Sequence, residues 1–184
     1  MTNGVQRTIG VAISIPSPYG EELRAYRASF GDALASSIPT HVTLLPPTEL
    51  DLPADVVTEH LARVAAKSRS FEIHLRGTST FRPVSPVVFV PLVQGIADCE
   101  LLEQAVRQGP LGREIQFYYH PHVTVAHHLS DDALDRAARE LSDFECRFTV
   151  EGFHLYEHGQ DEVWRAQGWF PFPVAGTADA ASSR

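Results

Sequence analysis

The three residues His-Val-Thr occur twice in this chain, at 41–43 and at 122–124. The surroundings read HVTLLPP for the first copy and HVTVAHH for the second, so apolar residues follow each one. On a β-strand, alternate side chains face opposite sides. The His and Thr of each copy would therefore share one face of a strand, while the apolar side chains pack on the other.

The segments around the two copies follow one order, which indicates an internal duplication. Apolar or alternating runs at 9–15 and 71–77 flank the first copy, and similar runs at 87–93 and 145–158 flank the second, with helical spacing between them. Each half thus reads strand, helix, HVT strand, helix, strand, and a last strand is expected at 163–172. We expect an α+β fold of two pseudo-symmetric lobes, each an antiparallel sheet with helices on one face, around a central cleft.

Two element boundaries are also predicted. Leu23, Tyr26, Phe30 and Leu34 are spaced for one face of a helix that follows the first strand. The strand that contains the first HVT should be short, since Pro46-Pro47 would stop it.

The length of 184 residues suits one domain made of two small lobes. We expect this domain to span residues 1–174, with approximate halves 8–80 and 86–172, and a flexible tail of small and polar residues at 175–184. Because two lobes complete one cleft, we expect a monomer.

Charge and composition limit the classes of molecule that this protein is expected to bind. The formal net charge of −8 argues against general binding of DNA or structured RNA, but it leaves room for a small anion in a local pocket. The first residues show no secretory signal pattern, and no apolar run is long enough to cross a membrane. A cytoplasmic protein is expected, with Cys99 and Cys146 as buried thiols.

Two imidazoles and two hydroxyls at one cleft would suit phosphoester chemistry. Imidazole titrates near neutral pH, so one ring can accept a proton from the attacking group while the other protonates the leaving oxygen. Threonine hydroxyls can donate to phosphate oxygens, where negative charge builds up in the transition state. The sequence does not decide which ring is the base; our working assignment makes His122 the base and His41 the acid.

With one His-x-Thr motif in each half, the chain resembles the 2H phosphoesterase superfamily, which includes 2′-5′ RNA ligase-like proteins and 2′,3′-cyclic phosphodiesterases. The resemblance extends from about Thr8 to Phe172. It implies hydrolysis of 2′,3′-cyclic phosphates of RNA ends or nucleotides, in some members with 2′-5′ ligation, without a metal or cofactor. It also implies that His41 and His122 are catalytic and that Thr43 and Thr124 bind the phosphate.

The chain departs from the family pattern at two positions. Pro46 stands where an aromatic residue is common, and His127 stands where an Arg is frequent. Without that Arg, a phosphate or RNA contact would be weaker, so a cyclic-phosphate nucleotide or a short RNA end fits better than a long polynucleotide.

Two other functions stay open. One is a non-catalytic protein that keeps the cleft and binds a nucleotide or an RNA end. The other is a zinc hydrolase that uses the histidines of the run from His120 to His128, since imidazole is a common zinc ligand. Further residues could line the cleft, and these are His120, His127, Tyr118, Tyr119, Arg82 and His74.

Overall fold

The computed structural model describes residues 7–114 and 117–174, and the expected tail at 175–184 lies outside them. In chain order the elements are β1 (Arg7–Ser14), α1 (Tyr19–Ser29), the 3-10 helix η1 (Ala33–Ser36), β2 (His41–Leu50), α2 (Ala54–Lys67), β3 (Phe71–Arg76), β4 (Ser79–Thr80), β5 (Val87–Gln94), α3 (Ile96–Val106), the 3-10 helix η2 (Gly109–Leu111), β6 (His122–His127), α4 (Asp131–Glu140), β7 (Glu145–Val150), β8 (Gly152–His158) and β9 (Trp164–Pro171).

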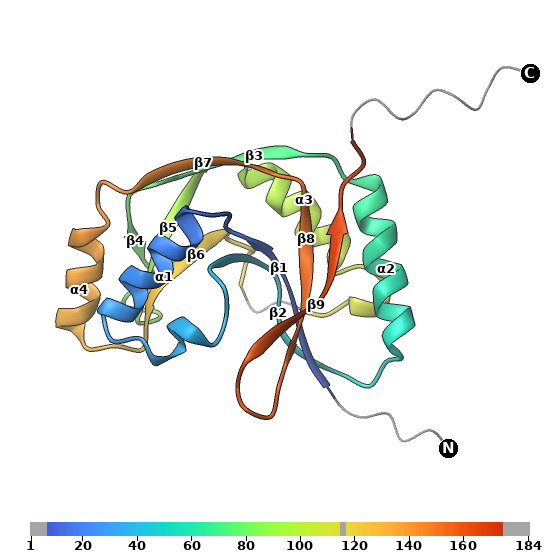
Figure 1. Ribbon diagram of the computed structural model, residues 1–184, viewed down its shortest axis with the longest axis horizontal. Coiled ribbons are helices and arrows are strands. Elements are labelled where there is room, and N and C mark those ends of the chain that lie inside the picture. The colour runs from blue at the N-terminus through green and yellow to red at the C-terminus, as the bar shows by residue number, and fades with distance from the viewer. Residues whose placement is uncertain (1–6, 115–116, 175–184) are drawn as a thin grey trace, which may run out of the picture.

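The strands form two antiparallel sheets (Figure 1). One sheet has the order β2-β1-β8-β9. In the other, the order is β4-β5-β3-β7, and β6 pairs with β5. The sheets are alike in that each HVT strand pairs with the strand that opens its own half of the chain, but β4 has no counterpart in the first sheet. The α+β fold with two antiparallel sheets is confirmed.

The two sheets do not coincide with the two halves of the sequence at 8–80 and 86–172. Strand β3 of the first half pairs with β5 and β7, whereas β8 of the second half pairs with β1. The run at 145–158, expected as one strand, is two strands that belong to different sheets. The break falls beside Gly152, where a Cβ atom would lie 2.4 Å from the carbonyl oxygen of Phe170.

The helices are exchanged in the same way. Helix α1 of the first half contacts β6, and α3 of the second half contacts β2. Helices α1 and α4 lie side by side at one end of the molecule (Figure 1), where Arg136 of α4 donates to the carbonyl of Ser29 at 3.2 Å. Each HVT strand is therefore covered by a helix from the other half of the chain.

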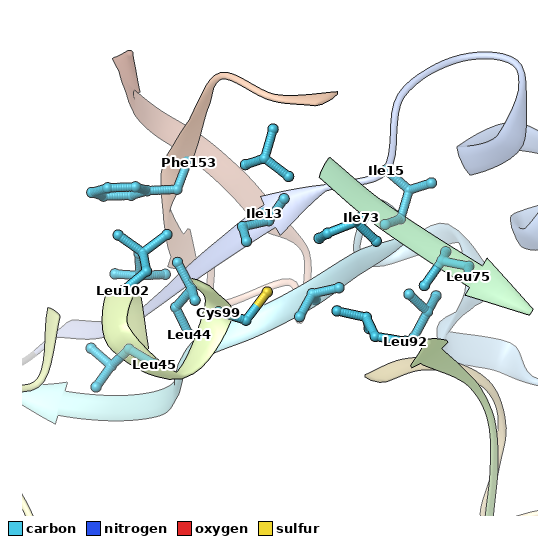
Figure 2. Close-up of a cluster of buried hydrophobic side chains, with 14 of the residues drawn as sticks. Ile13, Ile15, Leu44, Leu45, Ile73, Leu75, Leu92, Cys99, Leu102 and Phe153 are labelled. Carbon is cyan, nitrogen blue, oxygen red and sulfur yellow. The ribbon is translucent and has the colours of Figure 1, made fainter. Parts of the chain in front are cut away.

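One apolar core joins these layers. Val42 and Leu44 of β2 are at most 1% exposed, and Val123 and Val125 of β6 are fully buried. Figure 2 shows side chains from both sheets and from α3 meeting in this core. Those labelled there are Ile13, Ile15, Leu44, Leu45, Ile73, Leu75, Leu92, Cys99, Leu102 and Phe153. Cys99 and Cys146 are buried free thiols, as expected.

Two predicted boundaries are wrong for local reasons. Helix α1 ends at Ser29, because Gly31 adopts a left-handed φ of 92°, and Leu34 is left 47% exposed in η1. Strand β2 continues through Pro46 and Pro47 to Leu50. Strand β2 is the edge strand of its sheet, and its register with β1 shifts between Leu45 and Thr48, so Pro46 and Pro47 lie where neither is paired with a residue of β1.

Over residues 7–114 and 117–174, we find no helix with the length and apolar character that a membrane crossing requires.

Two glycines with positive φ test how tightly α3 joins the sheet. Gly95 precedes α3 with a φ of 90°, and a Cβ atom there would lie 2.6 Å from the carbonyl oxygen of Glu72. Gly31 has a φ of 92° but no atom within 4 Å of that position. Both Gly→Ala variants should lose roughly 1–2 kcal/mol of stability from backbone strain. Gly95→Ala should lose more in urea denaturation because the backbone of Glu72 must also shift, and an equal loss in both variants would contradict this.

Candidate active site

The two motif strands have the same local structure. From His41 to Leu45 and from His122 to Ala126, the residues are half-buried, buried, half-buried, buried and buried. The pairing of β1 with β2 is irregular just after Thr43, and that of β5 with β6 is irregular just after Thr124. In each strand the His and Thr thus face away from the core, while two successive apolar residues remain inside it.

Backbone carbonyls set the tautomer of both motif imidazoles. Nδ1 of His41 donates to the carbonyl of Pro39 at 2.7 Å, and Nδ1 of His122 donates to the carbonyl of His120 at 2.6 Å. A carbonyl oxygen only accepts, so Nδ1 carries the proton and Nε2 is left for chemistry. Within the described residues, no hydrogen bond engages either Nε2 or the hydroxyl of Thr43 or Thr124.

The fold brings the two motif strands together. Strands β2 and β6 contact each other across the sheets, and the hydroxyl of Tyr119 donates to the carbonyl of Thr43 at 2.9 Å. Among the smaller causes that lower the pKa of His41 is the positive charge of His122. The structure therefore places the His-x-Thr groups of distant segments beside one another.

Burial lowers the pKa of both imidazoles. For His41 burial is the largest cause, and the charges of Arg27 and His122 lower the pKa further. For His122 burial again comes first, with a contribution from His120. The hydrogen bonds to the carbonyls act in the opposite direction in both rings, since they favour the charged form.

Aromatic side chains enclose His122. The centroid of its ring lies 5.0 Å from that of Phe81, 5.1 Å from that of Phe89 and 6.0 Å from that of His120. Phe89 is opposite Thr124 in the pairing of β5 with β6. Sequence analysis did not include these phenylalanines, because only the strand register shows that Phe89 shares the face of the motif. His120, a predicted cleft residue, lies in this group.

A buried ion pair lies between α1 and the first motif, and it too was missed. Nε of Arg27 donates to Asp32 at 2.7 Å, and both side chains are buried. Asp32 also accepts from the amide of Leu34 and so caps η1, which leads to His41. The charge of Arg27 lowers the pKa of both His41 and His127, so this guanidinium lies near both motif strands. An Arg on an amphipathic helix gives no local signal of such a position.

The two predicted tyrosines have different surroundings. Tyr118 is 98% exposed and is not held against a motif strand. Tyr119 is half-buried and donates its hydroxyl to β2, and burial raises its pKa. Tyr119 therefore joins the second motif segment to the first as a positioning contact.

Three other predicted cleft residues are engaged by neighbours. Arg82 donates to Asp135 at 2.7 Å and to Asp131 at 3.4 Å, both on α4. Nε2 of His74 lies 2.7 Å from a carboxylate oxygen of Glu145 on β7. The ring centroid of His127 lies 3.9 Å from that of His128. Burial lowers the pKa of His127. We therefore take His41, His122 and their threonines as the centre of the candidate site.

The zinc alternative needs a set of converging ligands. In the part of the chain that the structure describes, no three His, Cys, Asp or Glu side chains are grouped closely enough to hold a metal ion. The run from His120 to His128 thus supplies no such set.

Comparison with known proteins identifies the family. A family model described as the 2′-5′ RNA ligase superfamily matches residues 15–162. The chain belongs to this superfamily. The match contains both His-x-Thr motifs and confirms the resemblance drawn from them.

Other proteins show the same relationship. A Bacillus cytotoxicus protein named "Putative phosphoesterase" is 28% identical over 138 residues, which are 72% of this chain and 78% of that protein. A protein of the same name from Bacillus thuringiensis strain Al Hakam is 26% identical over 138 residues, which again are 72% of this chain and 78% of that protein.

Solved structures confirm the superfamily fold. Escherichia coli LigT in complex with 3′-AMP superposes with a TM-score of 0.65 at 17% identity, covering 92% of this chain and all of LigT. The protein TT0787 of Thermus thermophilus superposes with a TM-score of 0.55 at 22% identity, covering 90% of this chain and 97% of that protein.

The juxtaposition of the two imidazoles predicts an electrostatic coupling. His122→Ala removes a positive charge near His41, so the pKa of His41 should rise, as followed by NMR titration of its ring protons. His128→Asn is a matched control, because the φ of 52° at this position suits Asn and His128 does not perturb His41. An unchanged pKa of His41 in His122→Ala would show that the rings are too far apart to act together.

Proposed function

We propose that this protein is a metal-independent phosphodiesterase that hydrolyses 2′,3′-cyclic phosphates of nucleotides or RNA ends. One observation carries the proposal: two imidazoles on equivalent strands are held by carbonyls as the same tautomer, each beside its own threonine hydroxyl. In the described residues no hydrogen bond engages Nε2 of either ring or the hydroxyl of either threonine, and all four residues are half-buried on the strand faces that point away from the core.

The reaction needs one neutral and one protonated imidazole. A neutral Nε2 accepts a proton from water as the water oxygen attacks phosphorus. The other Nε2–H gives its proton to the ribose oxygen as the bond between that oxygen and phosphorus breaks. We assign the first role to His122 and the second to His41, and the two rings exchange protonation states over one turnover. Because each ring disfavours a second positive charge nearby, the singly protonated pair is favoured over the doubly protonated one.

The threonines bind the phosphate in this proposal. Each hydroxyl lies on the same strand face as the imidazole two residues before it, so both can donate to non-bridging oxygens. The charge of Arg27 acts on His41 and His127, but its buried ion pair with Asp32 compensates it, so Arg27 does not replace the Arg expected at His127. The singly protonated imidazole pair favours a small anion despite the negative net charge of the chain.

The names of related proteins support this class of reaction. The Bacillus relatives carry the name phosphoesterase, and Escherichia coli LigT has been solved with 3′-AMP and with phosphate. We propose the same classes of ligand for this chain. One polypeptide contains both motifs, so a cytoplasmic monomer is sufficient for activity.

The same site would also suit two other functions, 2′-5′ ligation and nucleotide binding without turnover. If the 5′-hydroxyl of an RNA replaces water as the attacking group, the same two proton transfers give a 2′-5′ linkage. A protein that binds nucleotides without turnover would keep the geometry but form no product, so product formation separates it from the enzyme.

Substitution of the histidines tests the proposal directly. With 2′,3′-cyclic nucleotides in the presence of EDTA, wild type should form product, while His41→Ala and His122→Ala should each lose at least about 10²-fold in rate. His128→Asn should keep full activity, since the ring of His128 lies beside His127 rather than His41 or His122. Circular dichroism checks that each variant is folded.

The EDTA condition separates the alternatives. Loss of wild-type activity on chelation, with recovery on zinc addition, would favour the zinc hydrolase. Absence of product from all four cyclic nucleotides and from a cyclic-phosphate oligonucleotide would reject the enzyme.

The pH profile follows from the two lowered pKa values. The productive state, with one ring protonated, is most populated midway between the two apparent pKa values of the pair. Since both lie below the ordinary value of 6.5, kcat/KM should peak below pH 6.5. Bound phosphate stabilises protonated imidazole, so the optimum of kcat should lie at higher pH than that of kcat/KM. A kcat/KM optimum above pH 6.5 would be inconsistent with this assignment.

A further inference from the structure

The strand face that carries His41 and Thr43 continues across the whole first sheet. Side chains of directly paired residues lie on the same face. Ser14 is paired with His41, and Ala12 with Thr43. Across β8 and β9 the face continues with residues that are mostly aromatic, namely His154, Tyr156, His158, Trp164 and Trp169.

Small residues leave a cavity on this face beside the motif. Gly10 and Ala12 of β1 line a cavity of about 100 Å³ together with His41 and Thr43. Two aromatic residues, Tyr156 and Trp164, also line it. The indole of Trp164 lies 3.2 Å from the place that a Cβ of residue 10 would occupy, so the lack of a side chain at Gly10 lets it lie against the strand.

Polar groups occur beside the aromatic wall. The hydroxyl of Ser14 lies 2.7 Å from that of Tyr156 and 3.1 Å from Nδ1 of His154. Hydroxyl and imidazole groups both donate and accept hydrogen bonds. The side chains of Ser14, Tyr156 and His154 can therefore exchange hydrogen bonds with a base edge or a ribose hydroxyl. The same small region thus offers an aromatic surface, hydrogen-bonding groups and the candidate phosphate ligands.

We infer that the nucleoside of the substrate lies over this small open cavity rather than inside it, with its base stacked on Trp164 and its phosphate at His41 and Thr43. Ligand pockets commonly combine apolar and aromatic walls with a few polar groups. A base has a flat apolar face that can stack on the indole and polar edges that can bond to the side chains of Ser14, Tyr156 and His154. A free phosphate would contact only the His-x-Thr motif. The inference rests on the proposed function and adds that the substrate is recognised through its base.

Kinetics with two substrates separate base recognition from catalysis. On a 2′,3′-cyclic nucleotide, Trp164→Ala should lower kcat/KM about tenfold, mainly through KM, and Trp164→Phe should retain most of the wild-type value because it still stacks. On the 2′,3′-cyclic phosphate of 1-O-methyl ribose, which has no base, Trp164→Ala should equal wild type. Equal losses on both substrates, or no loss on either, would overturn the inference.

Fluorescence tests the same cavity without turnover. The protein contains two tryptophans, and Trp169 is not among the residues that line the cavity. In Trp169→Phe, where Trp164 alone emits, 3′-AMP should quench the fluorescence and inorganic phosphate should not. In Trp164→Phe the quenching by 3′-AMP should be largely lost.

The two readouts distinguish failure of the inference from failure of the proposed function. Quenching of Trp164 without product from any cyclic phosphate would leave the base site intact and reject the enzyme. Hydrolysis by wild type with no quenching of Trp164 by 3′-AMP would reject the base site and leave the enzyme intact.

Discussion

The site depends on the burial of the apolar side chains beneath each motif. Val42 and Leu44 on one strand, and Val123 and Val125 on the other, enter one core shared by both sheets. A one-residue slip of either strand would move these side chains to solvent and bring the imidazole into the core. The free energy of apolar burial therefore holds the orientation of the histidines and threonines.

The exchange of elements between the halves ties the two motifs into one unit. Helix α1 covers β6, helix α3 covers β2, and β3 and β8 each complete the sheet of the other half. Neither half can bury its apolar surfaces alone, so the motif strands cannot separate without opening the core. This arrangement gives a rigid support for the two motif histidines, which come from distant parts of the chain.

Burial and charge then adjust the chemistry of the imidazoles. Apolar walls such as Phe81 and Phe89 lower the pKa of His122, and Arg27 and His122 act on His41. The same sheet face that presents His41 also carries Trp164 and Tyr156, so in our proposals one surface serves both catalysis and recognition.

The sequence by itself determined most of the element order, the α+β class and the orientation of each His-x-Thr motif, because strand periodicity and apolar spacing are local properties. It did not show the break that divides residues 145–158 into β7 and β8. It also contained the superfamily resemblance, since the repeated triplet is visible in the chain. The extent of β2 and the end of α1 could not be read in this way: edge position made Pro46 and Pro47 tolerable, and a left-handed Gly31 stopped the helix.

Only the tertiary structure decided which strand pairs with which, and hence that the lobes exchange β3 and β8. For the same reason, it alone brought Arg27, Phe89 and Trp164 to the motifs. Register and long-range packing depend on contacts between segments far apart in the chain, and those contacts have no signature in local spacing.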